Sequence, residues 1–269
     1  MPELPEVETI KNELSPHIIG SQFTKLTIYD RTLVVKSAVE EFCRELTGQI
    51  VAGLQRRGKY LIISLANGKA LIIHLRMTGA LILNPETINK HVRAVFQFDN
   101  NNTMAFIDVR RLGVMWLATD INNLMDKLGP EPLGDEFNVN TLTRKLKGRK
   151  APIKAVLLDQ SIIAGIGNMY ADEALFNASI HPMKTAGNLS TKDIEKLYNA
   201  IVEVIQTAIN NKGASVANYK RPQGEPGTAH NYFKVAHLRG QPCPVCGEII
   251  QRLAVRNRGS YYCPNCQRE

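Results

Sequence analysis

The sequence contains no long hydrophobic run, and this bounds what the protein can be. Its apolar stretches all fall well short of the ~18 residues that a membrane span needs. The first eight residues carry three acids and no base, so they do not resemble a signal peptide. No internal repeat or low-complexity tract is evident either. We therefore expect a cytoplasmic protein with no membrane partner.

Acidic residues are the scarcer charge, with 25 Asp and Glu against 33 Lys and Arg, for a net charge of +8 and a pI of about 9.3. Such an excess favours a polyanionic partner and says nothing about fold. In a bacterium it predicts association with the nucleoid. The 269 residues suffice for two compact domains or one large one.

Cysteine is also scarce, and four of the five cysteines fall into one pattern. Cys243 and Cys246 form one C-x2-C pair, and Cys263 and Cys266 form a second, with sixteen residues between the two pairs. This spacing is typical of a tetrahedral site for one structural Zn²⁺ in a ribbon. The alternative, two disulfides in a secreted domain, is disfavoured by the missing signal peptide. Cys43 is expected to be a buried small hydrophobe.

The first half of the chain has the pattern of a helix followed by many short strands. Apolar positions spaced by three and four predict a helix over 5–18. A second helix is predicted at 37–46. Alternating segments bounded by turn residues predict strands at 23–29, 50–56, 60–65, 70–75, 80–83, 92–98, 103–108 and 114–117. Such closely spaced strands indicate an antiparallel sandwich or barrel.

The pattern changes near residue 129, where a Pro/Gly-rich segment at 129–134 is expected to be a linker. Helices are predicted at 139–146, 152–160, 168–177 and 191–211, the last with a capping box of Ser190 and Asp193. Residues 214–235 form a long polar stretch, of the kind that is usually functional or mobile. The cysteine module closes the chain.

The N-terminal segment carries a possible nucleophile. If Met1 is removed, Pro2 becomes a terminal secondary amine, and an α-amino group titrates near pH ~7.7–8.0. Such an amine forms Schiff bases with carbonyl carbons, and the neighbouring Glu3 could transfer the accompanying proton. The alternative is a proline-rich helix start whose acids favour the helix dipole.

Three basic or apolar turns add to this. Lys59, in Arg-Arg-Gly-Lys-Tyr at 56–60, is placed on a rigid strand element. The segment at 74–79, here the first tip, presents Met77, an apolar side chain of the kind that wedges between bases. The segment at 108–113, the second tip, combines two arginines with Leu112. Two such tips in one sheet domain predict an edge that reads nucleic acid.

Two further segments point to phosphate. Gly165 and Gly167 permit close backbone approach, and Asn168 is expected to cap the following helix, whose N–H groups would bind a phosphate. The alternative is a plain turn between helices. Arginines at 252, 256 and 258 are predicted to line the zinc hairpin and contact phosphates.

Together these motifs resemble the bacterial formamidopyrimidine-DNA glycosylase family over essentially the whole chain. The resemblance rests on the Pro-Glu-Leu-Pro-Glu-Val-Glu start, Arg-Arg-Gly-Lys-Tyr, His-Leu-x-Met-Thr-Gly, Gly-Ile-Gly-Asn-Met-Tyr-Ala-Asp-Glu and the terminal zinc finger. It implies an α+β fold: an N-terminal antiparallel β-sandwich with an N-terminal helix, then a helix-two-turn-helix domain with a zinc-ribbon hairpin. The implied division is 1–130, 131–235 and 236–269.

The resemblance also implies residue roles. Pro2 is then the nucleophile at the sugar C1′, Glu3 protonates the opening sugar, and Glu6 lies in the same pocket. The remaining roles concern phosphate contact and filling of the base stack. Lys59 contacts phosphate and serves the lyase steps. Asn168 and Arg258 bind the phosphates that flank the flipped nucleotide, supported by His74 and Arg111. The gap left in the base stack is filled by Met77, Arg111 and Leu112.

The implied activity is that of a bifunctional enzyme on damaged duplex DNA, expected to act as a monomer. It removes 8-oxoguanine and ring-opened purines, then cleaves the abasic site by β,δ-elimination. A relative of the endonuclease VIII type, acting on oxidised pyrimidines, usually begins Pro-Glu-Gly-Pro-Glu, and Leu4 disfavours it. A catalytically silent zinc-ribbon DNA-binding protein needs neither Pro2, Glu3 nor Lys59. Only the basic charge favours a zinc-ribbon RNA-binding protein.

The chain departs from the family pattern at three places. The second tip reads Val-Arg-Arg-Leu-Gly at 109–113 where Pro-Arg-Arg-Phe-Gly is usual, so an aliphatic wedge replaces an aromatic one. The frequent Val-Tyr-Gly before the zinc module is Val-Ala-His at 235–237. The stretch 214–235 is where the family caps 8-oxoguanine, and it is expected to set base specificity.

Overall fold

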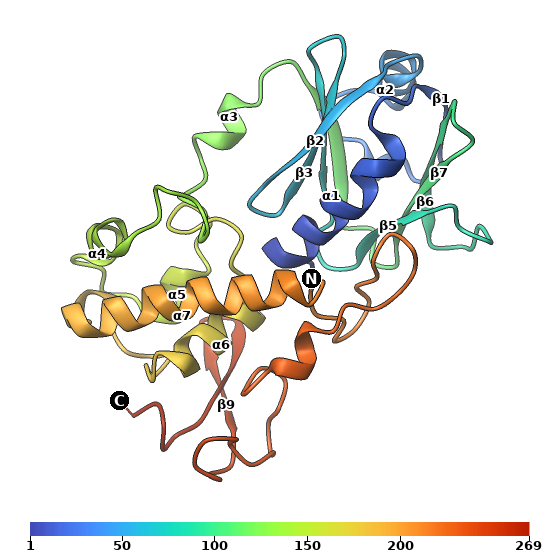
Figure 1. Ribbon diagram of the computed structural model, residues 1–269. Helices are drawn as coiled ribbons and strands as arrows, with labels where there is room; N and C mark the ends of the chain where they lie inside the picture. The colour runs from blue at the N-terminus through green and yellow to red at the C-terminus, as the bar shows by residue number, and fades with distance from the viewer. Residues whose placement is uncertain (269) are drawn as a thin grey trace. The chain divides into compact units, whose positions relative to one another are not determined.

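The computed structural model describes residues 1–268, which form two compact units (Figure 1). Unit 1 comprises residues 1–125 together with 211–230. Unit 2 comprises residues 126–210 together with 231 to the end of the described chain. The division into domains at 1–130, 131–235 and 236–269 stays a prediction.

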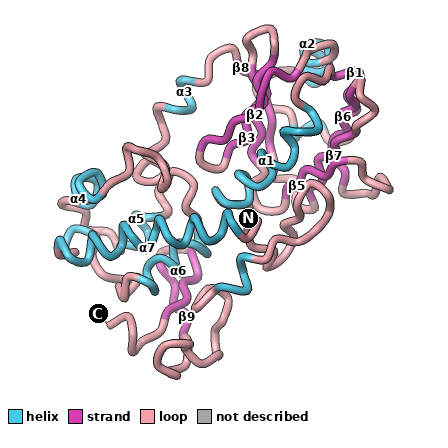
Figure 2. The backbone as a smooth tube through the Cα atoms, viewed as in Figure 1, coloured by secondary structure: helices cyan, strands magenta, loops and turns pink. Residues whose placement is uncertain are grey.

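Unit 1 contains two four-stranded antiparallel sheets, whose strands are magenta in Figure 2. One sheet has the order β1-β6-β7-β5, with β1 at Phe23–Ile28, β6 at Val92–Phe98, β7 at Thr103–Asp108 and β5 at Gly79–Leu83. The other has the order β2-β3-β4-β8, with β2 at Val51–Arg57, β3 at Tyr60–Leu65, β4 at Ala70–His74 and β8 at Val114–Ala118. The unit's helices are α1 (Leu4–Ile18), η1 (Arg31–Leu33), α2 (Val39–Leu46) and α3 (Asn122–Met125).

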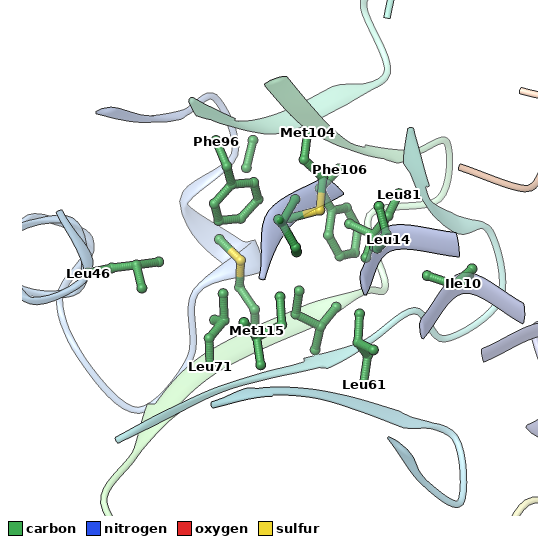
Figure 3. Close-up of a cluster of buried hydrophobic side chains, with 14 of the residues drawn as sticks. Ile10, Leu14, Leu46, Leu61, Leu71, Leu81, Phe96, Met104, Phe106 and Met115 are labelled. Carbon is green, nitrogen blue, oxygen red and sulfur yellow. The ribbon is translucent and has the colours of Figure 1, made fainter. Parts of the chain in front are cut away.

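The core of unit 1 lies between these sheets. Its buried side chains come from both sheets and from the apolar faces of α1 and α2. Figure 3 shows Phe96, Met104 and Phe106 on one side, Leu61, Leu71 and Met115 on the other, and Ile10 and Leu14 of α1 in the same layer. Each buried Leu or Phe contributes roughly 1.5–3 kcal/mol to folding. The predicted sandwich and its N-terminal helix are confirmed. Cys43 is half-buried at the edge of this core.

Residues 211–230 belong to unit 1 and are tied down at several points. Tyr219 is buried and packs against the sandwich core. Arg221 forms an ion pair with Glu13 of α1 at 2.6 Å, and the Pro222 carbonyl accepts a 2.7 Å hydrogen bond from the Leu83 N–H of β5. This polar stretch, called the strap below, is therefore an ordered segment that packs on unit 1 through both side-chain and backbone contacts.

Unit 2 is helical and ends in a hairpin. Its helices are α4 (Val139–Leu146), α5 (Ile153–Leu157), α6 (Asn168–Asn177), η2 (Ala186–Asn188) and α7 (Thr191–Asn210), and its hairpin pairs β9 (Gln251–Val255) with β10 (Arg258–Tyr262). The short helix η3 (Ala229–Tyr232) begins in the segment assigned to unit 1. The capping box at α7 is confirmed, since Ser190 and Asp193 each accept a 3.1 Å hydrogen bond from the other's backbone N–H. The predicted helix at 152–160 is shorter, ending at Leu157.

The segment at 129–134 was predicted to be a linker. This prediction is wrong, because the segment packs within unit 2. Gly129 and Pro130 are buried, and their backbone exchanges hydrogen bonds with the Gln160 carbonyl and the Ala164 N–H. A Cβ on Gly129 would lie 2.5 Å from the Ile162 backbone, so only glycine fits. Among the described helices, none has the length and apolarity to cross a membrane.

Candidate functional site

The start of α1 holds two carboxylates in a reciprocal arrangement. Glu3 is the N-cap residue, its side chain accepts from the Glu6 N–H, and Glu6 Oε2 accepts from the Glu3 N–H at 2.7 Å. The second oxygen of Glu6 accepts from the Ala214 N–H at 2.8 Å. Pro2, Glu3 and Glu6 are all buried, both acids being only 1% exposed. The segment is thus fixed at its first residues, where termini usually fray.

Lys59 lies in the two-residue turn between β2 and β3, next to Gly58, whose φ of +56° suits glycine. Lys59 is only 7% exposed. Arg56 ties this turn to α1, since its Nε pairs with Glu8 at 2.8 Å and its Nη1 donates to the Gly58 carbonyl at 3.1 Å. Sequence reasoning assigned no partner to Glu8, which it noted only as one of the three acids among the first eight residues.

His74 ends β4 and is buried opposite Tyr60, with ring centroids 4.6 Å apart. Burial, with the charges of Arg76 and Lys59, lowers the pKa of His74 to about 3. Its Nδ1 accepts from the Arg76 N–H at 3.1 Å, so the neutral ring carries its proton on Nε2. The ring is therefore a neutral donor beside the cationic Lys59 turn.

The two tips lie side by side because of sheet topology. The first tip connects β4 to β5 and the second connects β7 to β8, so each crosses from one sheet to the other. At one end His74 pairs with Val114, and at the other Gly79 pairs with Asp108. The predicted pair of neighbouring tips follows from these two registers.

The tips expose the residues expected to enter DNA. Met77 is 36% exposed and Leu112 is 42% exposed. Arg111 has φ +56°, a left-handed conformation that turns the second tip, and its Nε lies 3.5 Å from Asp30 Oδ2. The pKa of Asp30 is lowered: burial opposes the shift, but hydrogen bonds from Thr32 and the nearby arginines outweigh it.

In unit 2 the four cysteines of the two C-x2-C pairs converge. Their sulfur atoms all lie within 4.8 Å of one another, with 3.9 Å between Cys243 and Cys266 and 3.5 Å between Cys246 and Cys263. Tetrahedral Zn–S bonds of ~2.3 Å place sulfurs about 3.8 Å apart, whereas a disulfide requires ~2.05 Å. The donor set therefore fits one structural zinc ion and excludes disulfides.

The zinc hairpin is attached to α6 through the backbone of β10. Asn168 Nδ2 and Lys154 Nζ each donate to the Gly259 carbonyl at 3.0 Å, directly after the exposed Arg258. Asn168 was predicted to cap α6; this is wrong, because Gly167 is the N-cap and the Asn168 side chain turns to the hairpin. The Asn168 Oδ1 atom is buried with no partner in the described chain. In the turn before α6, the Gly165 N–H donates to Gln160 Oε1 at 2.9 Å.

A buried ion pair supports this attachment. Lys154 Nζ lies 2.6 Å from Asp172 Oδ1, both side chains are at most 1% exposed, and Asp172 Oδ2 accepts from the Tyr261 N–H at 3.2 Å. Burial raises the pKa of Asp172 to about 7, against the opposing charge of Lys154. Sequence reasoning did not assign either residue, although Asp172 lies one turn after Asn168, which an i, i+4 reading could have noticed.

Glu173 holds the segment that enters the zinc module. Its buried carboxylate accepts from three successive N–H groups, those of Lys234, Val235 and Ala236, at 2.8–3.1 Å. Burial raises the pKa of Glu173 against these hydrogen bonds. His237 follows with φ +64°, a conformation glycine adopts freely, where the family frequently has glycine. The His237 ring packs on the Tyr261 ring, with 5.3 Å between the ring centroids, and this contact compensates for the absence of glycine at this position.

These groups define two chemical surfaces. Unit 1 presents the buried carboxylate of Glu3 next to Pro2, a lysine turn and two exposed tips. Unit 2 presents an arginine hairpin fixed by a metal site and a buried pair. The first can supply an amine and an acid, and the second can bind phosphate.

Family models cover most of the chain. The formamidopyrimidine-DNA glycosylase N-terminal domain matches residues 1–115. The formamidopyrimidine-DNA glycosylase H2TH domain matches 128–220, and the zinc finger found in FPG and IleRS matches 240–268. A formamidopyrimidine-DNA glycosylase of Chloroflexus aurantiacus is 42% identical over 272 residues, covering 99% of this chain and 98% of the relative.

Solved structures agree over the full length. A complex of a Lactococcus lactis FPG mutant with Fapy-dG-containing DNA has a TM-score of 0.93 at 36% identity, covering 100% of both chains. MutM in complex with DNA containing carbocyclic 8-oxo-G gives a TM-score of 0.93 at 36% identity, again covering 100% of both chains.

Proposed function

Since the chain belongs to the formamidopyrimidine-DNA glycosylase family, we propose that it is a DNA glycosylase and abasic-site lyase of base excision repair, acting on oxidised purines in duplex DNA. Relatives bound to Fapy-dG and 8-oxo-G DNA support this substrate class. We further propose that it acts as a monomer on the bacterial nucleoid.

The observation that carries the proposal is the fixed, buried start of α1. A chain start that only entered a helix would need no second capping interaction, yet Glu6 also accepts from Ala214, 208 residues away. This arrangement holds Glu3 beside Pro2 in one geometry, as proton transfer at a reacting carbon requires.

The chemistry follows from these groups. With Met1 removed, the Pro2 nitrogen attacks the sugar C1′ and the bond from C1′ to the base breaks, the base leaving with its electron pair and taking a proton. Glu3 donates a proton to the ring oxygen as the sugar opens, leaving an iminium between Pro2 and C1′. The iminium acidifies the C2′ protons, and loss of one of them to the Glu3 carboxylate breaks the C3′–O bond and expels the 3′ phosphate. The conjugated iminium then acidifies the C4′ proton, and its loss breaks the C5′–O bond and expels the 5′ phosphate. The base must leave the stack before the amine can reach C1′.

Groups on both units would hold the DNA. Lys59 and the neutral His74 provide donors to phosphate near the reacting sugar. Asn168 and Arg258 provide further phosphate contacts from unit 2. Met77, Arg111 and Leu112 would fill the gap left in the stack. The four cysteines hold a structural zinc ion that orders the hairpin carrying Arg258.

The test is covalent trapping. The purified protein is incubated with an 8-oxoguanine:C duplex and borohydride, and any adduct is mapped by peptide mass spectrometry. We expect an adduct on Pro2, which also requires that Met1 has been removed. An adduct formed only on oxidised-pyrimidine duplexes would move the substrate to that class. DNA binding without any adduct would leave a silent DNA-binding protein.

A substitution at the nucleophile sharpens this test. Pro2→Gly keeps a terminal amine but alters its basicity and freedom, so we expect turnover to fall by about 10²-fold or more with DNA affinity retained. The measurement is single-turnover strand nicking beside a binding titration. As a control, Glu3→Gln in the Pro2→Gly background should remove the residual nicking. Normal nicking by that double variant would contradict the assignment of the nucleophile.

A further inference from the structure

The two tips are joined through one buried carboxylate, that of Asp108, which lies at the end of β7 and is 1% exposed. Its Oδ2 accepts from the Leu112 and Gly113 N–H groups at 2.8 and 2.7 Å. Its Oδ1 accepts from the Arg110 N–H at 3.1 Å. Three N–H groups of the second tip therefore point at a single side chain.

The same carboxylate reaches the first tip. The Thr78 hydroxyl, next to Met77, donates a hydrogen bond to Asp108 Oδ1. The Thr78 oxygen in turn accepts from the Arg110 N–H at 3.1 Å. Thr78, Asp108 and Arg110 thus form a closed triangle of hydrogen bonds that links the two tips.

The surroundings leave this arrangement little freedom. A Cβ on Gly113 would lie 2.6 Å from the Phe106 ring and 3.2 Å from Asp108 Oδ2. Buried Arg93 donates to the Asp108 carbonyl at 2.7 Å, so the backbone of Asp108 is held as well as its side chain. The Asp108 carboxylate accepts from the N–H groups of Arg110 and Leu112, which precede and follow Arg111, and this holds Arg111 in its left-handed conformation.

We propose that Asp108 is a positioning residue that couples Met77 to Arg111 and Leu112, so that the two tips enter the base stack as one rigid wedge. This rests on the proposed function. A carboxylate accepting several charge-assisted hydrogen bonds fixes a loop more strongly than neutral turns do. The aliphatic Leu112 stacks less well than an aromatic residue, which makes the rigidity of its backbone more important here.

The test compares two substrates that differ in whether a wedge is needed. A duplex with 8-oxoguanine requires the base to be extruded, whereas a single strand with a preformed abasic site has no stack to enter. For Asp108→Asn we expect kcat/KM on the duplex to fall by about tenfold or more, because the amide presents donors to N–H groups. Borohydride trapping on the single-stranded abasic site should change by less than about twofold.

Matched variants exclude a loss of folding as the cause. Asp99→Asn makes the same change in the β6–β7 turn, where Asp99 accepts from the Gln22 N–H, and should leave both substrates unaffected. Thr78→Val breaks only the link between tips and should lose about threefold on the duplex, while Thr78→Ser restores it. A 2-aminopurine opposite the lesion should report slower wedge insertion for Asp108→Asn and Thr78→Val alone.

The outcomes separate the two proposals. Equal losses on both substrates, or no loss on either, would overturn the positioning role of Asp108. An active wild-type enzyme with a duplex-selective loss in Asp108→Asn and Thr78→Val would support it. Absence of trapping by the wild-type protein on both substrates would overturn the proposed function itself.

Discussion

The two units fix their functional side chains by different physical means. In unit 1 the tips and the Lys59 turn are positioned by strand register and by carboxylates that accept backbone N–H groups, around a large apolar core. In unit 2 the Arg258 hairpin is positioned by a buried Lys154–Asp172 pair and a four-cysteine cluster, around a small apolar cluster.

The difference follows from the amount of core available. A sandwich of two sheets buries enough apolar surface to hold its loops rigidly. The terminal module is too small for that, and such modules usually depend on a metal. Unit 1 should therefore stay folded when single polar contacts are lost, whereas the zinc module should unfold when its metal or the buried pair that attaches it is disturbed.

The largest expected effect is loss of the zinc site. In Cys246→Ala, or after chelation, we expect the hairpin β9–β10 to unfold, since structural zinc contributes about 10 kcal/mol or more in small fingers. DNA binding should be lost. Hydrogen exchange should show fast exchange in β10 but continued protection in β3 and β4, whose core contains no metal ligand. Retained affinity in the zinc-free protein would contradict this.

The next effect concerns the buried pair. Lys154→Ala leaves the Asp172 carboxylate buried without its partner, and we expect a loss of about 3–5 kcal/mol in the free energy of unfolding of unit 2. The matched control is Lys11→Ala, which breaks a partly exposed pair with Glu8 and should cost below about 1 kcal/mol. Denaturant unfolding measures both. Similar losses in the two variants would contradict the comparison.

The pH dependence of the units should differ in sign. The pKa of His74 falls from 6.5 to about 3 on folding, so unit 1 gains stability as pH rises from 3 to 6.5, by roughly 1 kcal/mol per pH unit. The pKa of Asp172 rises from 3.8 to about 7, so its contribution to unit 2 is present below pH 3.8 and is lost as pH rises toward 7.

Hydrogen exchange of β4 and α6 amides between pH 4 and 7 measures this difference, after correction for intrinsic exchange rates. His74→Gln should flatten the pH dependence of amide protection in β4 and leave the pH dependence of protection in α6 unchanged. If protection of β4 and α6 changed with pH in the same direction in the wild-type protein, His74 and Asp172 would not be the groups that determine the pH dependence of stability.

The smallest effect compares the two capping boxes. Ser190→Ala removes a cap of α7, and we expect about 1 kcal/mol of lost stability with unchanged turnover. Glu6→Gln alters the other box, where the side chain also accepts from Ala214, and should reduce turnover as well as stability. Thermal unfolding and single-turnover nicking separate these effects. If Glu6→Gln left the rate of single-turnover nicking unchanged, the capping box of α1 would have only the stabilising role of the capping box of α7.

Local sequence determined the elements of this protein. The eight predicted strands and the helices 5–18, 37–46, 139–146, 168–177 and 191–211 all occur, with ends shifted by at most a few residues. Period and turn residues are local properties, so they can be read without knowing the fold. The zinc ligands were equally readable, because the C-x2-C spacing is set by the geometry of metal binding.

Tertiary structure alone decided which polar groups meet. The contact of Glu6 with Ala214, the joining of two tips by Asp108, and the turn of Asn168 toward Gly259 link residues from 30 to 208 positions apart. The docking of residues 129–134 and the strap at 211–230 likewise depend on distant partners. Polar side chains have no periodicity that identifies a distant partner, so only the packing of the core determines which of them become buried together.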